Sequence, residues 1–520
     1  MDPLKLPLGI QTFSKLRDSK TNFLYVDKTE EIHNLISSEG YFFLSRPRRF
    51  GKSMLLSTID AIFSGKQELF KGLWIYDQWD WSKQFPVIRF DLSGINNSSR
   101  AALEQELLLI IRANAERFGF DFRDIERPTL NATLRHFLIS LEKKFKAKAV
   151  LLIDEYDKPI QNTLDKEELP IIMRDALRDF YSAIKSSDDH LQFSLMTGIT
   201  KFGKMGLFSG ANNYTDISLN PKYATIVGFT HEELLQQFGN LFDGADMEKV
   251  REWYNGYNFL GNSVYNPFDI LPFLDGGHKF KNYWWQTGQT NFLINLLQTG
   301  SYDLPQVGKS RITEEQLGAF DVENIKLEVL LFQAGYLTIE REVNVGARIV
   351  YQMRIPNMEI ADSLNSLFFR VLSQLDDEHL HKRITAAEAL LFQDMELLET
   401  SLRTMFSSIA HQNYTGNQLQ KQEGYYAAVA YTYFRSIGFR INAEEASAQG
   451  RADLVIDTGQ SIYVIEFKVD AKNPGEALRQ IKDRGYHEPY LGQGLSVYLI
   501  GIHFNSEQKN VDVFDWELIK

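Results

Sequence analysis

The chain has 520 residues, no cysteine and a formal net charge of −12 at pH 7. This length exceeds what one hydrophobic core serves and indicates several domains. The acidic balance excludes a general attraction to nucleic acid or to an anionic membrane, so contact with DNA or RNA requires a local basic patch. Without cysteine there are no disulfides and no thiolate metal site. No signal peptide and no membrane-spanning run stand out, so we expect a cytoplasmic protein without a membrane partner.

A strand, a loop and a helix are expected around residue 50. Residues 41–44 predict a buried strand and residues 54–59 an apolar helix. Between them stands Arg46-Pro47-Arg48-Arg49-Phe50-Gly51-Lys52-Ser53. Gly51-Lys52-Ser53 is typical of the end of a phosphate-binding loop, whose backbone N–H groups bind a triphosphate while the lysine contacts its phosphates and the serine holds Mg²⁺. We therefore expect ATP to contact Arg49, Phe50, Gly51, Lys52, Ser53 and Met54.

This loop departs from the usual pattern G-x-x-x-x-G-K-[ST] at its first position. Arg46 stands where that pattern has glycine, and a side chain there is expected to crowd the turn. The alternative for the whole stretch is an ordinary strand–loop–helix with solvated arginines.

A second half of a nucleotide site is expected at a later strand. Residues 149–153 are all apolar and are followed by Asp154 and Glu155, a Walker B pattern. In such a pattern Asp154 holds Mg²⁺ and Glu155 polarises the attacking water. A buried strand with two capping acids is the alternative. The next apolar strand ends on Thr197, which is either a sensor of the γ-phosphate or a plain turn residue.

Strands and helices alternate through this part of the chain. A strand is expected over 85–92, and helices over 99–118, 129–146 and 165–186. This alternation predicts a parallel α/β sheet, with phosphate chemistry at the carboxyl ends of its strands.

Four phrases resemble the AAA-ATPase-like proteins of bacteria. They are Tyr25–Thr29, Arg46–Ser53, Ile153–Asp157 and Phe208–Asn213. In that family the arginine-rich loop without the first glycine is normal, so Arg46 does not indicate a decayed site. The resemblance spans residues 4–230 and implies that the chain binds and hydrolyses ATP with Mg²⁺.

Three further segments follow this region. Thr230 and Glu233 form the pattern of a capping box and open a new unit. The predicted domains are an AAA-ATPase-like P-loop domain over 1–229, a helical and winged lid over 230–357, a helical connector over 358–410 and a last domain over 411–520. In such ATPases a lid arginine often contacts the nucleotide, but the sequence does not indicate which one.

The last domain places its polar chemistry on two strands. A helix is expected over 423–436 and strands over 440–445, 451–457 and 461–468, then a helix capped by Asn473 and strands over 495–503 and 511–516. Glu466 and Lys468 are two residues apart and share a face of their strand. If Asp453 also points there, two carboxylates and a lysine meet, which suits Mg²⁺-assisted attack of water on a phosphodiester. The alternative is an exposed cross-strand ion pair.

This order of elements with Asp…Glu-x-Lys resembles the PD-(D/E)XK nuclease superfamily and its restriction-endonuclease-like α/β fold. The resemblance implies Asp453 and Glu466 as metal ligands and Lys468 as a catalytic residue. It also implies that Glu423 supports the metal and that Gln480 lines the site. The nominal proline is absent, since Ala452 precedes Asp453.

Taken together, the patterns predict an α/β protein: a P-loop NTPase parallel sheet with a helical and winged lid, followed by the nuclease-like domain. ATP binding and hydrolysis would control a Mg²⁺-dependent nuclease that acts on DNA or RNA, in defence or repair by resemblance. The alternative is a nucleotide-dependent switch or assembly protein whose nuclease fold only binds nucleic acid or is structural. Homo-oligomerisation is left open.

Overall fold

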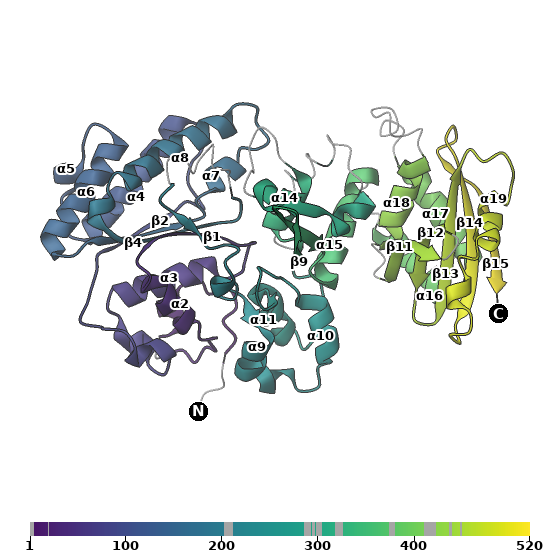
Figure 1. The fold of residues 1–520 in the computed structure, drawn as a ribbon, viewed down its shortest axis with the longest axis horizontal. Helices are drawn as coiled ribbons and strands as arrows, with labels where there is room; N and C mark the ends of the chain where they lie inside the picture. The colour runs from purple at the N-terminus through teal and green to yellow at the C-terminus, as the bar shows by residue number, and fades with distance from the viewer. Residues whose placement is uncertain are drawn as a thin grey trace. The chain divides into compact units, whose positions relative to one another are not determined.

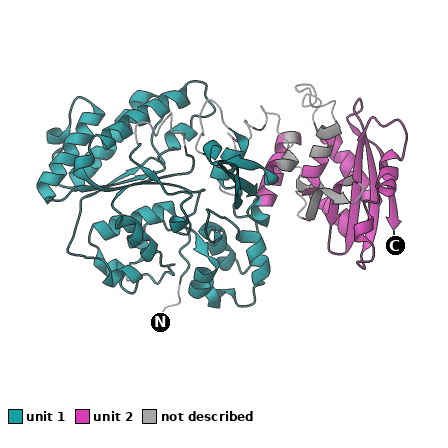
Figure 2. Ribbon diagram, viewed as in Figure 1, with its two compact units in different colours: residues 1–292, 308–360 teal, residues 293–307, 361–520 magenta. Residues whose placement is uncertain are grey.

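The computed structural model describes most of the chain. The described residues are 5–18, 20–201, 212–284, 293, 297, 304–317, 326–373, 380–409, 423–435, 439–447 and 450–519. The chain divides into two compact units: unit 1 comprises residues 1–292 and 308–360, and unit 2 comprises residues 293–307 and 361–520 (Figure 2). Among the described residues, no helix has both the length and the apolar character that crossing a bilayer requires.

Unit 1 is built on a five-stranded sheet in the order β2-β3-β4-β1-β5. Its strands are β1 (Gly40–Ser45), β2 (Val87–Asp91), β3 (Ala149–Asp154), β4 (Leu191–Gly198) and β5 (Thr215–Asp216). Every neighbouring pair is parallel, which confirms the predicted parallel sheet. Because β4 lies between β1 and β3, the carboxyl ends of these three strands meet at one edge.

Helices cover both faces of this sheet, as a parallel sheet requires. Figure 1 shows α2 (Thr29–Ile36) and α3 (Lys52–Phe63) on one face, with α4 (Arg100–Arg117), α6 (Leu130–Phe145) and α8 (Leu169–Lys185) on the other. The side chains of Ser99 and Thr129 cap α4 and α6 by accepting from backbone N–H groups in the first turn. These caps explain why the predicted starts of both helices agree with the observed ones.

The rest of unit 1 contains a helical cluster and a small sheet. Helices α9 (His231–Phe238), α10 (Met247–Tyr254) and α11 (Pro267–Asp275) share one hydrophobic core. The predicted capping box of α9 is confirmed, since Thr230 and Glu233 exchange both hydrogen bonds. Beside α14 (Leu327–Ala334), strands β8 (Arg311–Thr313), β10 (Arg348–Arg354) and β9 (Thr338–Val345) form an antiparallel sheet. The domain boundaries themselves remain predictions.

Unit 2 is a five-stranded mixed sheet in sequence order. Its strands are β11 (Arg440–Ser447), β12 (Gly450–Asp457), β13 (Ser461–Val469), β14 (Ser496–Asn505) and β15 (Asn510–Ile519). Only β13 and β14 are parallel. One face packs on α16 (Leu380–Phe392), α17 (Met395–Ser408) and α18 (Glu423–Arg435), and the other on α19 (Glu476–Asp483). Residues 386–409, for which a connector was expected, therefore contribute to the core of this unit.

The predicted cap of α19 is wrong. The helix begins at Glu476, and its N-cap is Gly475 with a φ of 73°. Glycine adopts this left-handed conformation without strain, so the chain changes direction directly before the helix. Asn473 therefore lies outside the helix and cannot cap it.

Candidate functional sites

The loop between β1 and α3 surrounds the ammonium group of Lys52. This side chain is 4% exposed, and its Nζ donates to the carbonyl oxygens of Arg46 and Pro47, both at 3.0 Å. Both oxygens belong to the loop itself, so the ammonium lies within the turn that the loop makes between β1 and α3. Burial lowers the pKa of Lys52, and the charges of Glu155 and Asp154 oppose that shift.

The two predicted Walker B acids lie at the same edge. The Thr197 hydroxyl at the end of β4 donates to Asp154 Oδ1 at 2.7 Å, and the Glu155 N–H donates to the same oxygen at 3.1 Å. Thr197 is buried and holds Asp154 in place; its role as a γ-phosphate sensor remains a prediction. The two acids therefore occupy different positions: Asp154 is fixed at the strand end, and Glu155 follows it.

Glu155 has the properties expected of a strained functional residue. Its φ of 52° is unusual for a residue with a side chain, and such backbone strain concentrates at active sites. Burial raises the pKa of the Glu155 carboxyl, and the ammonium of Lys52 opposes this shift. The interaction with Lys52 brings the predicted base and the predicted phosphate-binding lysine into one electrostatic cluster.

The turn after β3 contains a further acid to which the sequence patterns gave no role. Asp157 Oδ2 accepts from the N–H groups of Ile199 at 3.1 Å and Thr200 at 2.6 Å. A Cβ on Gly198 would lie 2.4 Å from the Tyr156 ring and 2.6 Å from Asp157 Oδ1. Asp157 thus connects the turn after β3 to the two residues that follow β4, Ile199 and Thr200. The signal available in the sequence was a third carboxylate three residues after Asp154.

The remaining residues predicted to contact the nucleotide differ in burial and in their side-chain contacts. The guanidinium of Arg49 lies 3.7 Å over the Phe268 ring, and the backbone of Arg49 has a φ of 65°. Phe50 is fully buried, so only its backbone is available to a nucleotide. Ser53 and Met54 are half-buried in the first turn of α3, which begins at Lys52. Most of the phrase Phe208–Asn213 lies outside the described residues.

Unit 2 brings four of its five predicted site residues together. The Glu466 carboxylate accepts from Gln480 of α19 and lies 3.4 Å from Lys468 Nζ. Glu466 Oε2 also accepts from the Asp453 N–H at 3.4 Å, and Asp453 Oδ2 accepts from the Phe467 N–H at 2.9 Å. Asp453 and Glu466 therefore face each other where the ladder between β12 and β13 ends. Glu423 begins α18, but its side chain lies outside the described residues.

Glu466 is a carboxylate held at an electrostatic cost. It is 2% exposed, and burial together with the charge of Asp453 raises its pKa to about 7, while Lys468 opposes the shift. Two facing carboxylates suit Mg²⁺, which prefers such oxygen ligands and would neutralise their repulsion. Among the described residues, no group of three or more histidine, aspartate or glutamate side chains is arranged so that it could hold a metal ion. Waters or phosphate oxygens would complete the coordination of an ion bound by two carboxylates.

The sequence patterns missed one histidine beside this site. His503 of β14 pairs in register with Lys468, and its Nε2 accepts from the Ala477 N–H at 3.3 Å. The side chain is 3% exposed, and burial lowers its pKa. His503 therefore links β14 to the first turn of α19, the helix that supplies Gln480. Only the pairing of β13 with β14 reveals this neighbour, because the two residues are far apart in the sequence.

Two regions of the chain match known families. Residues 7–208 match the family described as Predicted AAA-ATPase, and residues 421–514 match the PD-(D/E)XK nuclease superfamily. A protein of Azotobacter chroococcum mcd 1 named "Uncharacterized protein in vnfD 5'region" is 38% identical over 514 residues, 98% of each chain. The chain belongs to the AAA-ATPase-like family and carries a PD-(D/E)XK nuclease superfamily domain.

Both resemblances expected from the motifs are thus confirmed. The AAA-ATPase-like region contains β1 to β4 with the loop and both Walker B acids, and the nuclease-superfamily region contains β11 to β14 with Asp453, Glu466 and Lys468. Families of these kinds typically use ATP and Mg²⁺, and the geometry of both sites is compatible with these cofactors.

Proposed function

We propose that unit 1 binds and hydrolyses ATP with Mg²⁺ and that this reaction controls a Mg²⁺-dependent nuclease centre in unit 2. Nucleic acid, DNA in the first place, is the substrate of that centre. The nucleotide shifts the equilibrium between states that differ in nuclease activity. The setting in defence or repair follows from the family alone.

The ATPase part is supported by the groups gathered at the ends of β1, β4 and β3. Lys52 would bind the β- and γ-phosphates, and Ser53 with Asp154 would hold the cation. Glu155 would orient and polarise the attacking water, and its raised pKa keeps it a usable base. Thr197 and Asp157 would keep both acids in place through the hydrogen bonds described above.

The nuclease part rests on one observation: two facing carboxylates, a lysine and an amide meet beside α19. Bound Mg²⁺ would activate water and stabilise charge on the phosphate. Asp453 and Glu466 would hold it, Lys468 would stabilise the charge that develops on the phosphate, and Gln480 would orient Glu466. An exposed ion pair does not account for a carboxylate that is 2% exposed.

The deciding experiment measures cleavage of DNA and RNA with Mg²⁺, in the presence and in the absence of ATP. We expect cleavage whose rate changes with ATP. Nucleic-acid binding without any cleavage would instead support the alternative, a nucleotide-dependent switch whose nuclease fold only binds. ATP hydrolysis with neither binding nor cleavage would leave the C-terminal domain a structural role.

Replacing Lys52 by alanine is expected to weaken ATP binding by about 2 kcal/mol or more, roughly thirtyfold in Kd, because a buried charge-assisted contact is lost. Isothermal titration calorimetry measures this affinity. Lys66→Ala, at an exposed position shortly after the same helix, is the control and should bind ATP as the wild type does. Equal affinities of all three proteins would contradict the assignment of the loop.

Replacing Lys468 by alanine is expected to slow cleavage about a hundredfold while leaving Mg²⁺ affinity largely intact, because an ammonium group does not ligate a cation. Single-turnover cleavage and titration with Mg²⁺ provide the two readouts. Lys482→Ala, which removes a lysine paired with Glu517 elsewhere in the same unit, is the matched control. A large loss of Mg²⁺ affinity in Lys468→Ala would show that the lysine only organises the acids.

A further inference from the structure

Arg46 occupies the position where phosphate-binding loops usually have their first glycine. Its φ does not lie in the left-handed region, so the backbone here does not require glycine. The side chain is 1% exposed, although arginine is rarely buried so completely without partners. A guanidinium buried to this degree requires hydrogen-bond partners within the protein.

The guanidinium of Arg46 attaches the start of the loop to a neighbouring segment. Nη1 donates to the carbonyl oxygens of Ser45 at 2.9 Å and Ser218 at 2.6 Å, and Nη2 donates to that of Tyr223 at 3.2 Å. Ser45 strengthens the same junction, since its N–H donates to Ser218 Oγ at 2.8 Å. These bonds connect the first residues of the loop to the segment that follows β5.

One aromatic ring touches both ends of the loop. The Arg46 guanidinium carbon lies 3.9 Å from the centre of the Phe259 ring, and the Phe50 ring meets the same ring edge-on at 5.8 Å. Phe50 is also fixed through its backbone, because the Gly228 N–H donates to its carbonyl oxygen at 3.2 Å. The loop is thus held at Arg46 and at Phe50, and the carbonyl oxygen of Arg46 accepts from Lys52 Nζ.

We propose that Arg46 is a positioning residue for nucleotide binding, whose side chain holds the loop in its open, ligand-receiving shape. This inference rests on the proposed function and extends it to a residue that the general motif assigns to glycine. It has an unusual consequence: restoring the consensus glycine should impair nucleotide binding, because the loop loses its attachment and spends less time in the competent shape. The apparent Kd rises as the competent fraction falls.

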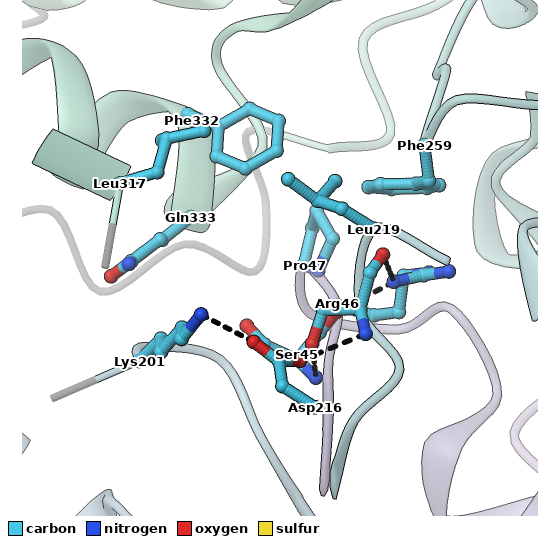
Figure 3. Close-up of a pocket in the computed structure, with 11 residues that line it drawn as sticks. Ser45, Arg46, Pro47, Lys201, Asp216, Leu219, Phe259, Leu317, Phe332 and Gln333 are labelled. Atoms are coloured by element: carbon cyan, nitrogen blue, oxygen red, sulfur yellow. Dashed lines mark hydrogen bonds and ion pairs between the residues drawn. The ribbon is translucent and has the colours of Figure 1, made fainter. Parts of the chain in front are cut away.

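A pocket beside Arg46 makes this inference testable by chemical rescue. Figure 3 shows Ser45, Arg46, Leu219 and Phe259 among the residues that line it. The pocket has about 430 Å³ of space, part of it open to solvent. Removing the Arg46 side chain adds its volume to this pocket, so a free guanidinium ion can reach the vacated carbonyl oxygens and the face of Phe259.

The experiment measures ATP affinity of full-length Arg46→Gly with and without millimolar guanidinium chloride, far below the molar concentrations that unfold proteins. We expect Kd for ATP to rise about tenfold or more in Arg46→Gly and to recover most of that loss when guanidinium is added. Sodium chloride at equal ionic strength controls for screening. Arg46→Gln keeps Cβ and part of the donor set, so its Kd for ATP should lie between those of the wild type and Arg46→Gly. This variant replaces Arg46→Gly in the experiment if the glycine variant does not fold.

Arg354→Gly is the matched control for a merely structural loss. Arg354 also donates to three backbone carbonyl oxygens of unit 1, those of Ile355, Pro356 and Gly256, without touching the loop. The variant Arg354→Gly should lower the midpoint of thermal unfolding while leaving ATP affinity within about twofold of the wild type.

Three outcomes distinguish a failure of the proposed role of Arg46 from a failure of the proposed ATP binding. If wild-type protein does not bind ATP, the proposed function itself fails. If the wild type binds ATP and Arg46→Gly binds it equally well, the function stands and the role of Arg46 is overturned. A weakened Arg46→Gly variant that guanidinium does not restore also overturns it, because the defect then does not lie in the missing cation.

Discussion

Replacing Glu466 by glutamine is expected to abolish Mg²⁺-dependent cleavage and, at the same time, to stabilise the metal-free protein at pH 8. The carboxylate is a proposed metal ligand, and an amide is a far poorer one. The same carboxylate is buried opposite Asp453, so its charge destabilises the folded protein when no cation is present. Activity and stability should therefore change in opposite directions.

The pH dependence of the Glu466 charge determines how large the expected gain in stability is. The pKa of Glu466 is raised from 4.5 to about 7, so below pH 4.5 the carboxyl is protonated in the folded and the unfolded chain and carries no penalty. Between about pH 4.5 and pH 7 the unfolded chain has released this proton while the folded chain still holds it, so about 3 kcal/mol of stability is lost over this range and stays lost at pH 8. Glu466→Gln does not titrate, so at pH 8 it should unfold roughly 5–10 °C above the metal-free wild type, and near pH 4 the difference should vanish.

Calorimetric unfolding with EDTA at both pH values, together with a cleavage assay, checks this prediction. Glu517→Gln changes a carboxylate paired with Lys482 in the same unit and should affect neither readout strongly. Addition of Mg²⁺ should stabilise the wild type at pH 8 and leave Glu466→Gln unchanged, because only the wild type gains the bound ion. A less stable Glu466→Gln at pH 8 would mean that its hydrogen bonds outweigh the repulsion from Asp453.

Replacing Glu155 by glutamine is expected to lower ATP turnover about a hundredfold or more while Kd for ATP changes little. The amide keeps the shape and the strained backbone position but cannot polarise water. Removing the carboxylate also removes one of the charges that oppose the lowered pKa of Lys52, but the charges of Asp154 and Asp157 remain to oppose it, so Lys52 should still bind the phosphates. Steady-state turnover and calorimetric binding, measured on the same preparation, separate the two quantities.

Glu116→Gln is the control for this variant, since Glu116 forms an exposed pair with Arg112 on α4. It should match the wild type in both measurements. Turnover near the wild-type value in Glu155→Gln would show that another group activates the water. Asp157 would then be the first residue to test, because it lies in the same turn and its Oδ1 has no hydrogen-bond partner among the residues that the structure describes.

The sequence was most informative where one local pattern determines one element. The apolar runs of β1 and β3 could be recognised directly, because a strand buried on both faces tends to be a continuous apolar stretch. The strand β4 could be recognised although Gln192 and Ser194 interrupt its apolar run. The starts of α4 and α6 could be recognised at Ser99 and Thr129, because serine and threonine are favoured at the N-cap, where their side chains accept from backbone N–H groups of the first turn. The start of α19 could not, because the left-handed backbone of Gly475 decides it and Asn473 offers an equally plausible cap.

The candidate sites were predictable to the extent that a residue's role follows from its own motif. The roles predicted for Lys52, Glu155, Glu466 and Lys468 come from their own motifs and stay predictions. The hydrogen bond from Thr197 to Asp154 depends on β4 lying between β1 and β3, which no local pattern states. The contacts of the Arg46 side chain depend on Ser218, Tyr223 and Phe259, all of which are more than 170 residues away in the sequence. Long-range packing of this kind is invisible to a motif.

The contact between Gly198 and the turn after β3 limits which residues position 198 can accept and how the turn can be transferred to another protein. Because a Cβ at position 198 would overlap Tyr156 and Asp157, the identity of one residue at the end of β4 is dictated by two residues that follow β3. A homologue that exchanged both Tyr156 and Asp157 for smaller residues would release position 198 to vary, and the three positions should change together during divergence. A designer who grafts the Asp154–Asp157 turn onto another parallel sheet must also graft this glycine, or the turn cannot close against its neighbour.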